Sequence, residues 1–315
     1  MEHKMIFVMI AGASASGKTA FSQRLLERLQ QDSRSCQMIS MDNYYKERDV
    51  LKYPDIDLFR QDPQVYAPTH LCLQQLCDDL TALAQGQSIY QKTLIFATNR
   101  YQRDASGELI LEKIDPSDII IMEGVFAQHF ADAYLPAEYP RVSVNVASSS
   151  YLNIIKARLE RDTAPLPIGR ALTRQQVRAN ERQFVGPVFF QYTAKHATGS
   201  DVYILNDHSN DNLEGGLFEE GIEAVVDKIN EIQQALESTP YLPKKNPLDA
   251  RQMAKASHAM LHAQRAPKRH HQHDIIEAMQ KRSKIVGPFF KSPVMEDDLP
   301  PQPDQGKSIQ NDTII

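Results

Sequence analysis

Residues 5–24 constrain the fold of this chain more than any other stretch. Met5 to Ile10 form an uncharged apolar run, which is the pattern of a strand buried on both faces. Directly after it, residues 12–19 read GASASGKT and match the phosphate-binding pattern G-x-x-x-x-G-K-[ST]. Apolar residues at helical spacing come next, at Phe21, Leu25, Leu26 and Leu29. The motif therefore stands in the context that it requires, between a strand and a helix.

The residue types of this motif suit a polyphosphate ligand. Gly12 and Gly17 let the backbone bring its N–H groups close to an anion, and the helix that begins there adds its N-terminal donors. Lys18 provides a positive charge for the β- and γ-phosphates, and the Thr19 hydroxyl can hold Mg²⁺. We therefore predict ATP and Mg²⁺ as cofactors, with the nucleotide bound by Gly12, Ala13, Ser14, Ala15, Ser16, Gly17, Lys18 and Thr19.

Further apolar runs predict the other core strands, at residues 36–41, 118–122, 141–146 and 201–205. Helical patterns lie between and after them, at residues 71–83, 151–162, 172–184 and 213–236. Buried strands that alternate with helices are typical of an α/β fold with a parallel β-sheet flanked by helices. We also expect extended segments at 88–95 and 108–114, and a proline-rich loop with short turns at 49–68.

Three acidic residues follow the ends of predicted core strands, at Asp42, Glu123 and Asp207. A parallel sheet gathers these strand ends around the phosphate-binding loop. Phosphoryl transfer to a hydroxyl group needs a base for the hydroxyl proton and a carboxylate beside Mg²⁺. We predict Asp42 as the base, and Glu123 together with Thr19 as the metal-side residues. Helix capping is the structural alternative for each acid, and the Asn-Asp pair at Asp207 fits a turn better than a site.

A basic cluster follows at Lys156, Arg158, Arg161 and Arg170. Arg158 and Arg161 are three residues apart and therefore share one face of the predicted helix. Arginines on a mobile lid can close over the negative charge of a transferring phosphoryl group. A solvated basic surface gives the same pattern, so the residues alone leave both interpretations open.

Four segments together resemble the motifs of a known family. GASASGKT, MDNYYK, IIIMEG and KARLERD resemble, in order and spacing, the uridine kinase and phosphoribulokinase-like P-loop kinases, over about residues 5–236. The resemblance implies a P-loop NTPase fold with a lid. It also implies that Asp42 is the catalytic base, that Tyr45 lies near a nucleoside, and that Glu123 ends the core strand. The lid motif of the family falls on Arg158, Arg161 and Asp162.

The acceptor half of the chain departs from the family pattern. Where uridine kinases have an Asp that holds the ribose, this chain has Gln64, and Asp55 and Asp57 nearby are possible substitutes. Ala157 stands in place of one lid arginine. The base-binding strand lacks the family's Tyr, and its base-facing positions fall on one of two pairs, Phe96 and Tyr101 or Thr93 and Thr98. The resemblance therefore supports a kinase more strongly than it supports uridine as the acceptor.

The composition changes at Ser238. Residues 238–315 hold 9 of the 18 prolines and 5 of the 10 histidines, and carry 12 Lys and Arg against 8 Asp and Glu. We expect a kinase domain over residues 1–237, followed by a basic C-terminal extension that is partly helical and partly disordered. The histidine-rich run 270–274 and the basic run 281–284 fit exposed surface better than a metal or nucleic-acid site.

The remaining composition favours a cytoplasmic protein with a small-molecule hydroxyl substrate. The three cysteines have irregular spacing and suggest neither a disulfide framework nor a zinc site. The chain has no apolar run near 18 residues and no signal-peptide pattern, so we expect no membrane partner. Residues 1–237 carry 23 Lys and Arg against 32 Asp and Glu, which argues against general nucleic-acid binding. A homo-oligomer stays open.

We therefore predict an ATP- and Mg²⁺-dependent kinase of uridine kinase type, which transfers the γ-phosphate to a hydroxyl of a nucleoside such as uridine or cytidine. The predicted catalytic residues are Lys18, Asp42, Arg158 and Arg161. The predicted acceptor contacts are Tyr45, Phe96 and Tyr101. Two alternatives stay open, namely the same chemistry on another nucleoside or a sugar phosphate, and a nucleotide-binding regulatory protein that does not catalyse.

Overall fold

The computed structural model describes residues 5–49, 51, 53–166, 169–207 and 217–238. The chain divides into two units, Met1–Leu242 and Pro243–Ile315, and all described residues lie in the first. The predictions for the C-terminal extension, including the runs 270–274 and 281–284, lie outside the described residues. Among the helices that the structure describes, none combines the length and apolar character needed to cross a lipid bilayer.

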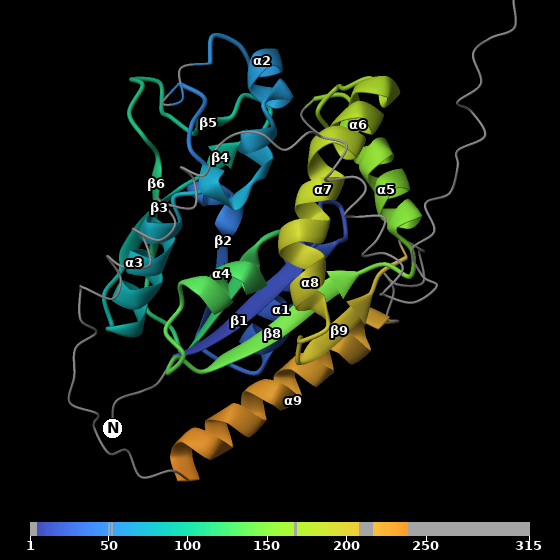
Figure 1. The fold of residues 1–315 in the computed structure, drawn as a ribbon. Coiled ribbons are helices and arrows are strands. Elements are labelled where there is room, and N and C mark those ends of the chain that lie inside the picture. The colour runs from blue at the N-terminus through green and yellow to red at the C-terminus, as the bar shows by residue number, and fades with distance from the viewer. Residues whose placement is uncertain (1–4, 50, 52, 167–168, 208–216, 239–315) are drawn as a thin grey trace, which may run out of the picture. The chain divides into compact units, whose positions relative to one another are not determined.

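The first unit is built on a five-stranded sheet of β1 (Ile6–Gly12), β2 (Cys36–Ser40), β7 (Ile119–Glu123), β8 (Arg141–Ala147) and β9 (Val202–Leu205) (Figure 1). The strand order is β2-β7-β1-β8-β9, and every neighbouring pair is parallel. β1 occupies the centre, where Val8 pairs with Ile121 on one side and Val142 on the other. The predicted parallel α/β sheet is confirmed.

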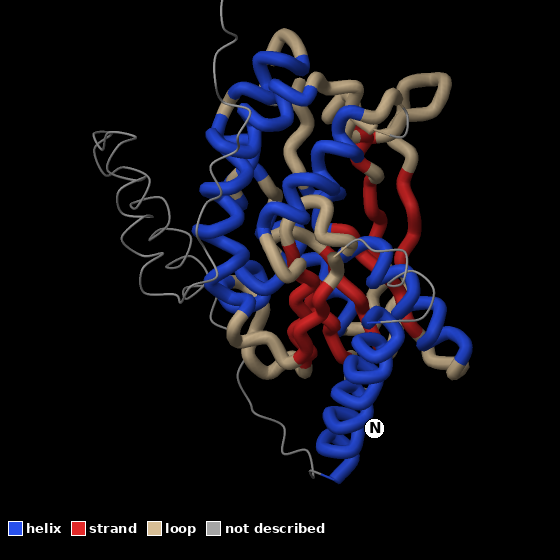
Figure 2. Tube along the Cα trace, turned by 90° about the vertical axis from the view of Figure 1, so that its right-hand side faces the viewer, coloured by secondary structure: helices blue, strands red, loops and turns tan. Residues whose placement is uncertain are grey.

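Helices cover both faces of the sheet, and Figure 2 shows the strands in red between helices in blue. Successive side chains of β1 point to opposite faces of the sheet, so alternate residues pack with different helices. Ile6, Val8 and Ile10 pack with α1 (Lys18–Gln31) and α9 (Leu217–Ser238), whereas Phe7 and Met9 pack with α3 (Leu73–Ala84) and α4 (Ala127–Ala133). Because both sets of side chains are buried, the strand is apolar without interruption.

The segment between β2 and β7 holds the residues predicted to contact the acceptor, Tyr45, Phe96 and Tyr101. The predicted extended segments become two small antiparallel ribbons, β3 (Ile89–Lys92) with β6 (Leu111–Ile114) and β4 (Leu94–Ile95) with β5 (Arg100–Tyr101). Residues 49–68 hold more helix than predicted. They form α2 (Ile56–Gln61) and η2 (Pro63–Tyr66), and η3 (Pro68–His70) begins at their end, while η1 (Met41–Tyr44) lies earlier, directly after β2. Proline is the first residue of η2 and of η3. The first N–H groups of a helix have no acceptor within the helix, so the N–H that proline lacks is not needed there.

After β8 the chain forms α5 (Tyr151–Thr163) and then a long helical stretch. The stretch consists of α6 (Arg174–Asn180), η4 (Glu181–Val185), α7 (Gly186–Val188), η5 (Phe189–Thr193) and α8 (Ala194–Ala197). Apolar spacing predicted its first part, residues 172–184, and the family resemblance implied a helix that includes Pro187, Phe189 and Tyr192. The segments η4 and η5 on either side of α7 are π-helical, which accommodates a proline without ending the helix. Figure 1 shows α5 to α7 rising opposite α2 and the β4–β5 ribbon.

Candidate active site

The phosphate loop is packed so closely that its two glycines have no room for a side chain. A Cβ on Gly12 would lie 2.2 Å from the Val146 carbonyl oxygen, and a Cβ on Gly17 would lie 2.2 Å from Asn206 Nδ2. Gly17 also has a φ of 89°, in the left-handed region. The Asn206 amide donates a hydrogen bond of 2.9 Å to the Ser16 carbonyl. Asn206 is thus a site residue that the sequence reasoning assigned to a turn.

The loop carries donors suited to phosphate. Lys18 is 7% exposed, and the Ser16 hydroxyl is buried without a hydrogen-bond partner among the described residues. Buried polar groups of this kind normally have partners, so the loop fits an anionic ligand that supplies one. A cavity of about 430 Å³ adjoins the loop and is lined by residues 15 and 17–19 and by Ala157, Glu160 and Arg161.

Thr19 and Glu123 meet as the sequence predicted for a Mg²⁺ site. Thr19 Oγ1 lies 3.4 Å from Glu123 Oε2, and the Ser40 hydroxyl donates a 2.6 Å hydrogen bond to Glu123 Oε1. Glu123 is 3% exposed at the end of β7. A hydroxyl and a carboxylate oxygen beside the phosphate loop are the hard oxygen ligands that Mg²⁺ prefers, so the residues fit the ion.

Asp42 lies in η1 directly after β2, close to these groups. Its backbone N–H donates to the Ser40 hydroxyl at 3.4 Å, so Ser40 contacts both predicted acids. Burial, reinforced by the negative charge of Glu123, raises the pKa of Asp42 to about 6, although Lys18 and the arginines oppose the shift. Ser40 was missed by the sequence reasoning, and its place as the helix N-cap before Met-Asp was the available signal.

The three predicted acceptor contacts have different environments. The Tyr45 ring lies 6.3 Å from the Phe96 ring and 5.6 Å from the His70 ring. Phe96 is 40% exposed. Tyr101 is buried, and its hydroxyl donates to the Tyr45 carbonyl at 2.7 Å. Tyr45 and Phe96 therefore form one aromatic surface, while Tyr101 supports the backbone behind it.

The proposed substitutes for the ribose-binding Asp have structural contacts. Asp55 caps α2, accepting hydrogen bonds from the N–H groups of Asp57 and Leu58 at 2.9 and 2.8 Å. Asp57 has a side chain that is 71% exposed, at 3.8 Å from Arg60. Gln64 is exposed as well. We therefore do not retain Asp55 or Asp57 as ribose contacts.

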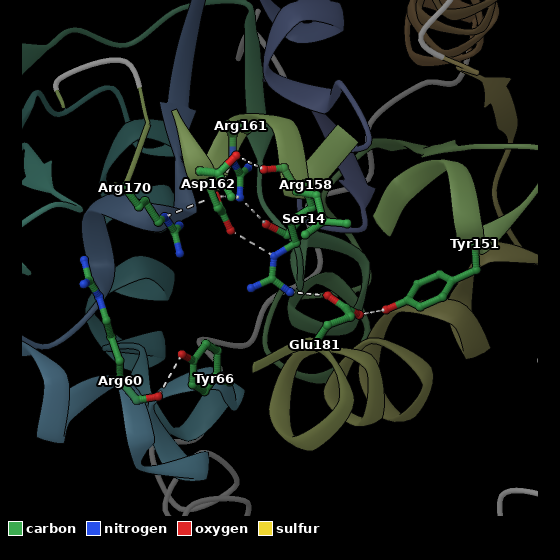
Figure 3. A network of polar contacts seen from close by, with 11 residues as sticks. Ser14, Arg60, Tyr66, Tyr151, Arg158, Arg161, Asp162, Arg170 and Glu181 are labelled. Atoms are coloured by element: carbon green, nitrogen blue, oxygen red, sulfur yellow. Dashed lines mark hydrogen bonds and ion pairs between the residues drawn. The ribbon is translucent and has the colours of Figure 1, made fainter. Parts of the chain in front are cut away.

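Asp162 organises the basic cluster (Figure 3). Its fully buried carboxylate lies 3.2 Å from Arg158 Nε, 2.8 Å from Arg161 Nη2 and 3.6 Å from Arg170 Nε. The three arginines together hold its pKa below the ordinary value, against the opposing effect of burial. The alternative of a solvated basic face fits Lys156, which is exposed, whereas Arg158 is buried and Arg161 is partly exposed.

The two predicted catalytic arginines point to different partners. Arg158 is 2% exposed and lies between Asp162 and Glu181, and Glu181 also accepts a hydrogen bond from Tyr151. Arg161 instead donates a 3.1 Å hydrogen bond to the Ser14 hydroxyl of the phosphate loop. In this conformation Arg161 contacts the loop, and Arg158 is enclosed by carboxylates, so we revise the predicted role of Arg158 from phosphate contact to positioning.

Comparison with known proteins shows the family of this chain. The model of the phosphoribulokinase / uridine kinase family matches residues 7–212. The chain belongs to this family. A uridine kinase of Ligilactobacillus salivarius (strain UCC118) is 26% identical over 231 residues, which cover 73% of this chain and 95% of that protein. A uridine kinase of Shewanella halifaxensis (strain HAW-EB4) is 28% identical over 208 residues, 65% of this chain and 89% of that protein.

Among solved structures, one titled as a possible uridine kinase from Bacillus stearothermophilus aligns with 64% of this chain and 89% of its own length. The TM-score is 0.41 at 15% identity. Membership of the family confirms the resemblance drawn from the four motifs and supports phosphotransferase activity.

Proposed function

We propose that the protein is an ATP- and Mg²⁺-dependent kinase that transfers a phosphoryl group to a hydroxyl of a small molecule. The observation that carries this proposal is a shared arrangement beside three neighbouring strands. Lys18 and Thr19 begin α1 after β1, Glu123 ends β7 and contacts Thr19, and Asp42 follows β2. The uridine kinases among its relatives make a nucleoside, uridine or cytidine, the first acceptor to test.

The residues divide the work of phosphoryl transfer. Bound ATP supplies the phosphoryl group, and bound Mg²⁺ neutralises part of its charge. Lys18 holds a positive charge against the terminal phosphates, and Thr19 with Glu123 offers oxygen ligands to the metal ion. Arg161 reaches the Ser14 hydroxyl of the loop from α5 and would add a second cation to a nucleotide site there.

Asp42 accepts the proton of the acceptor hydroxyl. Its carboxylate must be ionised to do so, and the raised pKa makes it a stronger base than an exposed carboxylate. Tyr45 and Phe96 provide an apolar surface beside it for an organic acceptor. Ser40 fixes the backbone of Asp42 relative to Glu123.

The rival proposal is a nucleotide-binding regulatory protein, which the divergent acceptor half favours. Measuring ADP release with a panel of nucleosides, sugars and sugar phosphates separates the two. The kinase proposal requires at least one acceptor that raises ADP release in the native chain, with loss of that rate in Lys18→Ala and Asp42→Asn. ATP binding without any acceptor-dependent release would support the regulatory protein instead.

A further inference from the structure

Hydrogen bonds to other elements anchor the chain directly after Asp42. The Tyr44 hydroxyl donates a hydrogen bond of 2.7 Å to Asp79 of α3. The Tyr45 carbonyl accepts one, also of 2.7 Å, from the hydroxyl of Tyr101 in β5. The backbone that follows Asp42 is therefore fixed both to α3 and to the small antiparallel ribbons.

Asn43 provides the shortest link between Asp42 and these ribbons, because it is the next residue in the chain. Its Nδ2 donates a hydrogen bond of 3.1 Å to Oε1 of Gln91 in β3. Its Oδ1 accepts one of 3.0 Å from the backbone N–H of Leu94 in β4. These partners lie 48 and 51 positions away, so both hydrogen bonds join separate elements, unlike the bonds of a local turn or a helix cap.

Both partners of Asn43 are withdrawn from water, since Gln91 is 5% exposed and Leu94 is 7% exposed. A buried backbone N–H needs an acceptor, and the Gln91 side-chain oxygen needs a donor. The Asn43 amide supplies both, because its oxygen accepts and its nitrogen donates. An apolar residue at position 43 would leave two buried polar groups without these bonds. An aspartate could accept from Leu94 but could not donate to Gln91.

The Asn43 link joins two parts of the proposed site. On one side is Asp42, and on the other is the end of β4, which Phe96 directly follows. The Phe96 ring lies 6.3 Å from the Tyr45 ring, and these two rings form the aromatic surface described above. The position of a base relative to a bound acceptor matters strongly, because a misplacement of about 1 Å can cost about 10²-fold in rate.

We propose that Asn43 is a positioning residue, which fixes the Asp42 carboxylate relative to the aromatic surface of Tyr45 and Phe96. This inference rests on the proposed function, because it takes Asp42 as the base. Asn43 acts through the backbone of η1 on one side and through β3 and β4 on the other.

The turnover of Asn43→Ala tests this role, with saturating ATP and Mg²⁺ and the best acceptor of the panel. We expect kcat to fall by about 10- to 100-fold, whereas the KM for ATP should change by less than about threefold because the phosphate loop is not altered. Gln91→Leu removes one of the two bonds and keeps Leu94 paired, so kcat should fall in the same direction but less. Glu112→Gln is the matched control, because it changes an exposed residue directly opposite Gln91 and should keep kcat within about twofold.

The double variant Asp42→Asn with Asn43→Ala separates positioning of the base from a general loss of structure. If Asn43 acts through Asp42, adding Asn43→Ala to Asp42→Asn should lower kcat further by less than about threefold. A further loss as large as that in the native chain overturns the inference. A native kcat in Asn43→Ala also overturns it.

Amide hydrogen exchange of the full chain, read by mass spectrometry without an acceptor, tests the anchoring independently of activity. We expect Asn43→Ala to speed exchange by at least about tenfold in peptides that cover residues 41–45 and 91–95, and Glu112→Gln to leave both peptides unchanged. Unchanged exchange in Asn43→Ala overturns the inference.

The inference and the proposed function fail separately. If Asp42→Asn lowers turnover and Asn43→Ala does not, the kinase stands and the positioning role is wrong. If Asn43→Ala speeds exchange but no acceptor gives ADP release that depends on Asp42, the anchoring stands and the proposed function is wrong.

Discussion

The buried carboxylate of Asp42, the proposed base, lowers the stability of the folded chain when it is ionised. Burial and the charge of Glu123 raise its pKa from an ordinary 3.8 to about 6. The folded state thus favours the neutral carboxyl, whose stabilising contribution is present below pH 3.8 and lost as the pH rises through 6. We expect Asp42→Asn without nucleotide to be more stable than the native chain at pH 8, by on the order of 1–3 kcal/mol. Urea unfolding at pH 8 should show this difference, and below pH 3.8 the contribution of ionisation should vanish.

The proposed metal-side role of Glu123 can be tested by a substitution that removes only its charge. Glu123→Gln keeps an oxygen for the Ser40 hydroxyl but removes the charge beside Thr19. We expect the Mg²⁺ concentration for half-maximal rate to rise by about tenfold, since one charged ligand is lost. Ser40→Ala, which keeps the carboxylate, is the control and should shift the Mg²⁺ requirement less. An unchanged Mg²⁺ requirement in Glu123→Gln would remove Glu123 from the metal site.

The sequence predicted where Lys18, Asp42 and Glu123 lie in the fold, because a local motif and the ends of apolar runs fix these places. It could not predict contacts between segments far apart in the chain. Asn206 reaches Ser16 across 190 positions, and Arg158 is buried because Glu181, 23 positions later, faces it. Hydrophobic periodicity predicts which face of a helix or strand is apolar, but it does not predict which polar side chains contact each other.

At the scale of elements, Glu181 joins α5 to the helical stretch that follows it. It is nearly buried and contacts Arg158 and Tyr151, both from α5. Glu181→Gln leaves the buried Arg158 with Asp162 alone, and we expect the free energy of unfolding to fall by about 2–4 kcal/mol. Glu108→Gln, an exposed change of the same type, should alter it by less than about 0.5 kcal/mol. Equal effects of the two substitutions in chemical denaturation would contradict a joining role.

The element boundaries show where local signals end and packing takes over. The five core strands match their apolar runs within two residues, because burial on both faces leaves little freedom in sequence. Apolar spacing alone ended the helix at residue 184, and only the family resemblance carried it past Pro187, where Tyr151 and Phe189 stack at 5.2 Å and hold the later turns against α5. A proline in the sequence predicts a helix boundary, and it carries no information about such packing between helices.

At the scale of the whole molecule, the described fold closes with α9. Phe218, Val225 and Ile229 of this helix pack on the face of the sheet that also holds α1. We expect a chain that ends at Ser238 to unfold cooperatively and keep acceptor-dependent ADP release, measured by circular dichroism and a coupled assay. A chain that ends at Asp207 exposes that face and should not fold. Failure of the longer chain to fold would show that residues after Ser238 complete the domain.

The central claim is that Asp42 is the base of a phosphoryl transfer, and the turnover of Asp42→Asn tests it most directly. The measurement compares kcat of the variant and the native chain at pH 8, with saturating ATP and Mg²⁺ and the best acceptor of the panel. We expect kcat to fall by about 10²–10⁴-fold, the usual worth of a positioned base, while ATP affinity changes by less than about threefold. A kcat within about threefold of the native value would contradict the account.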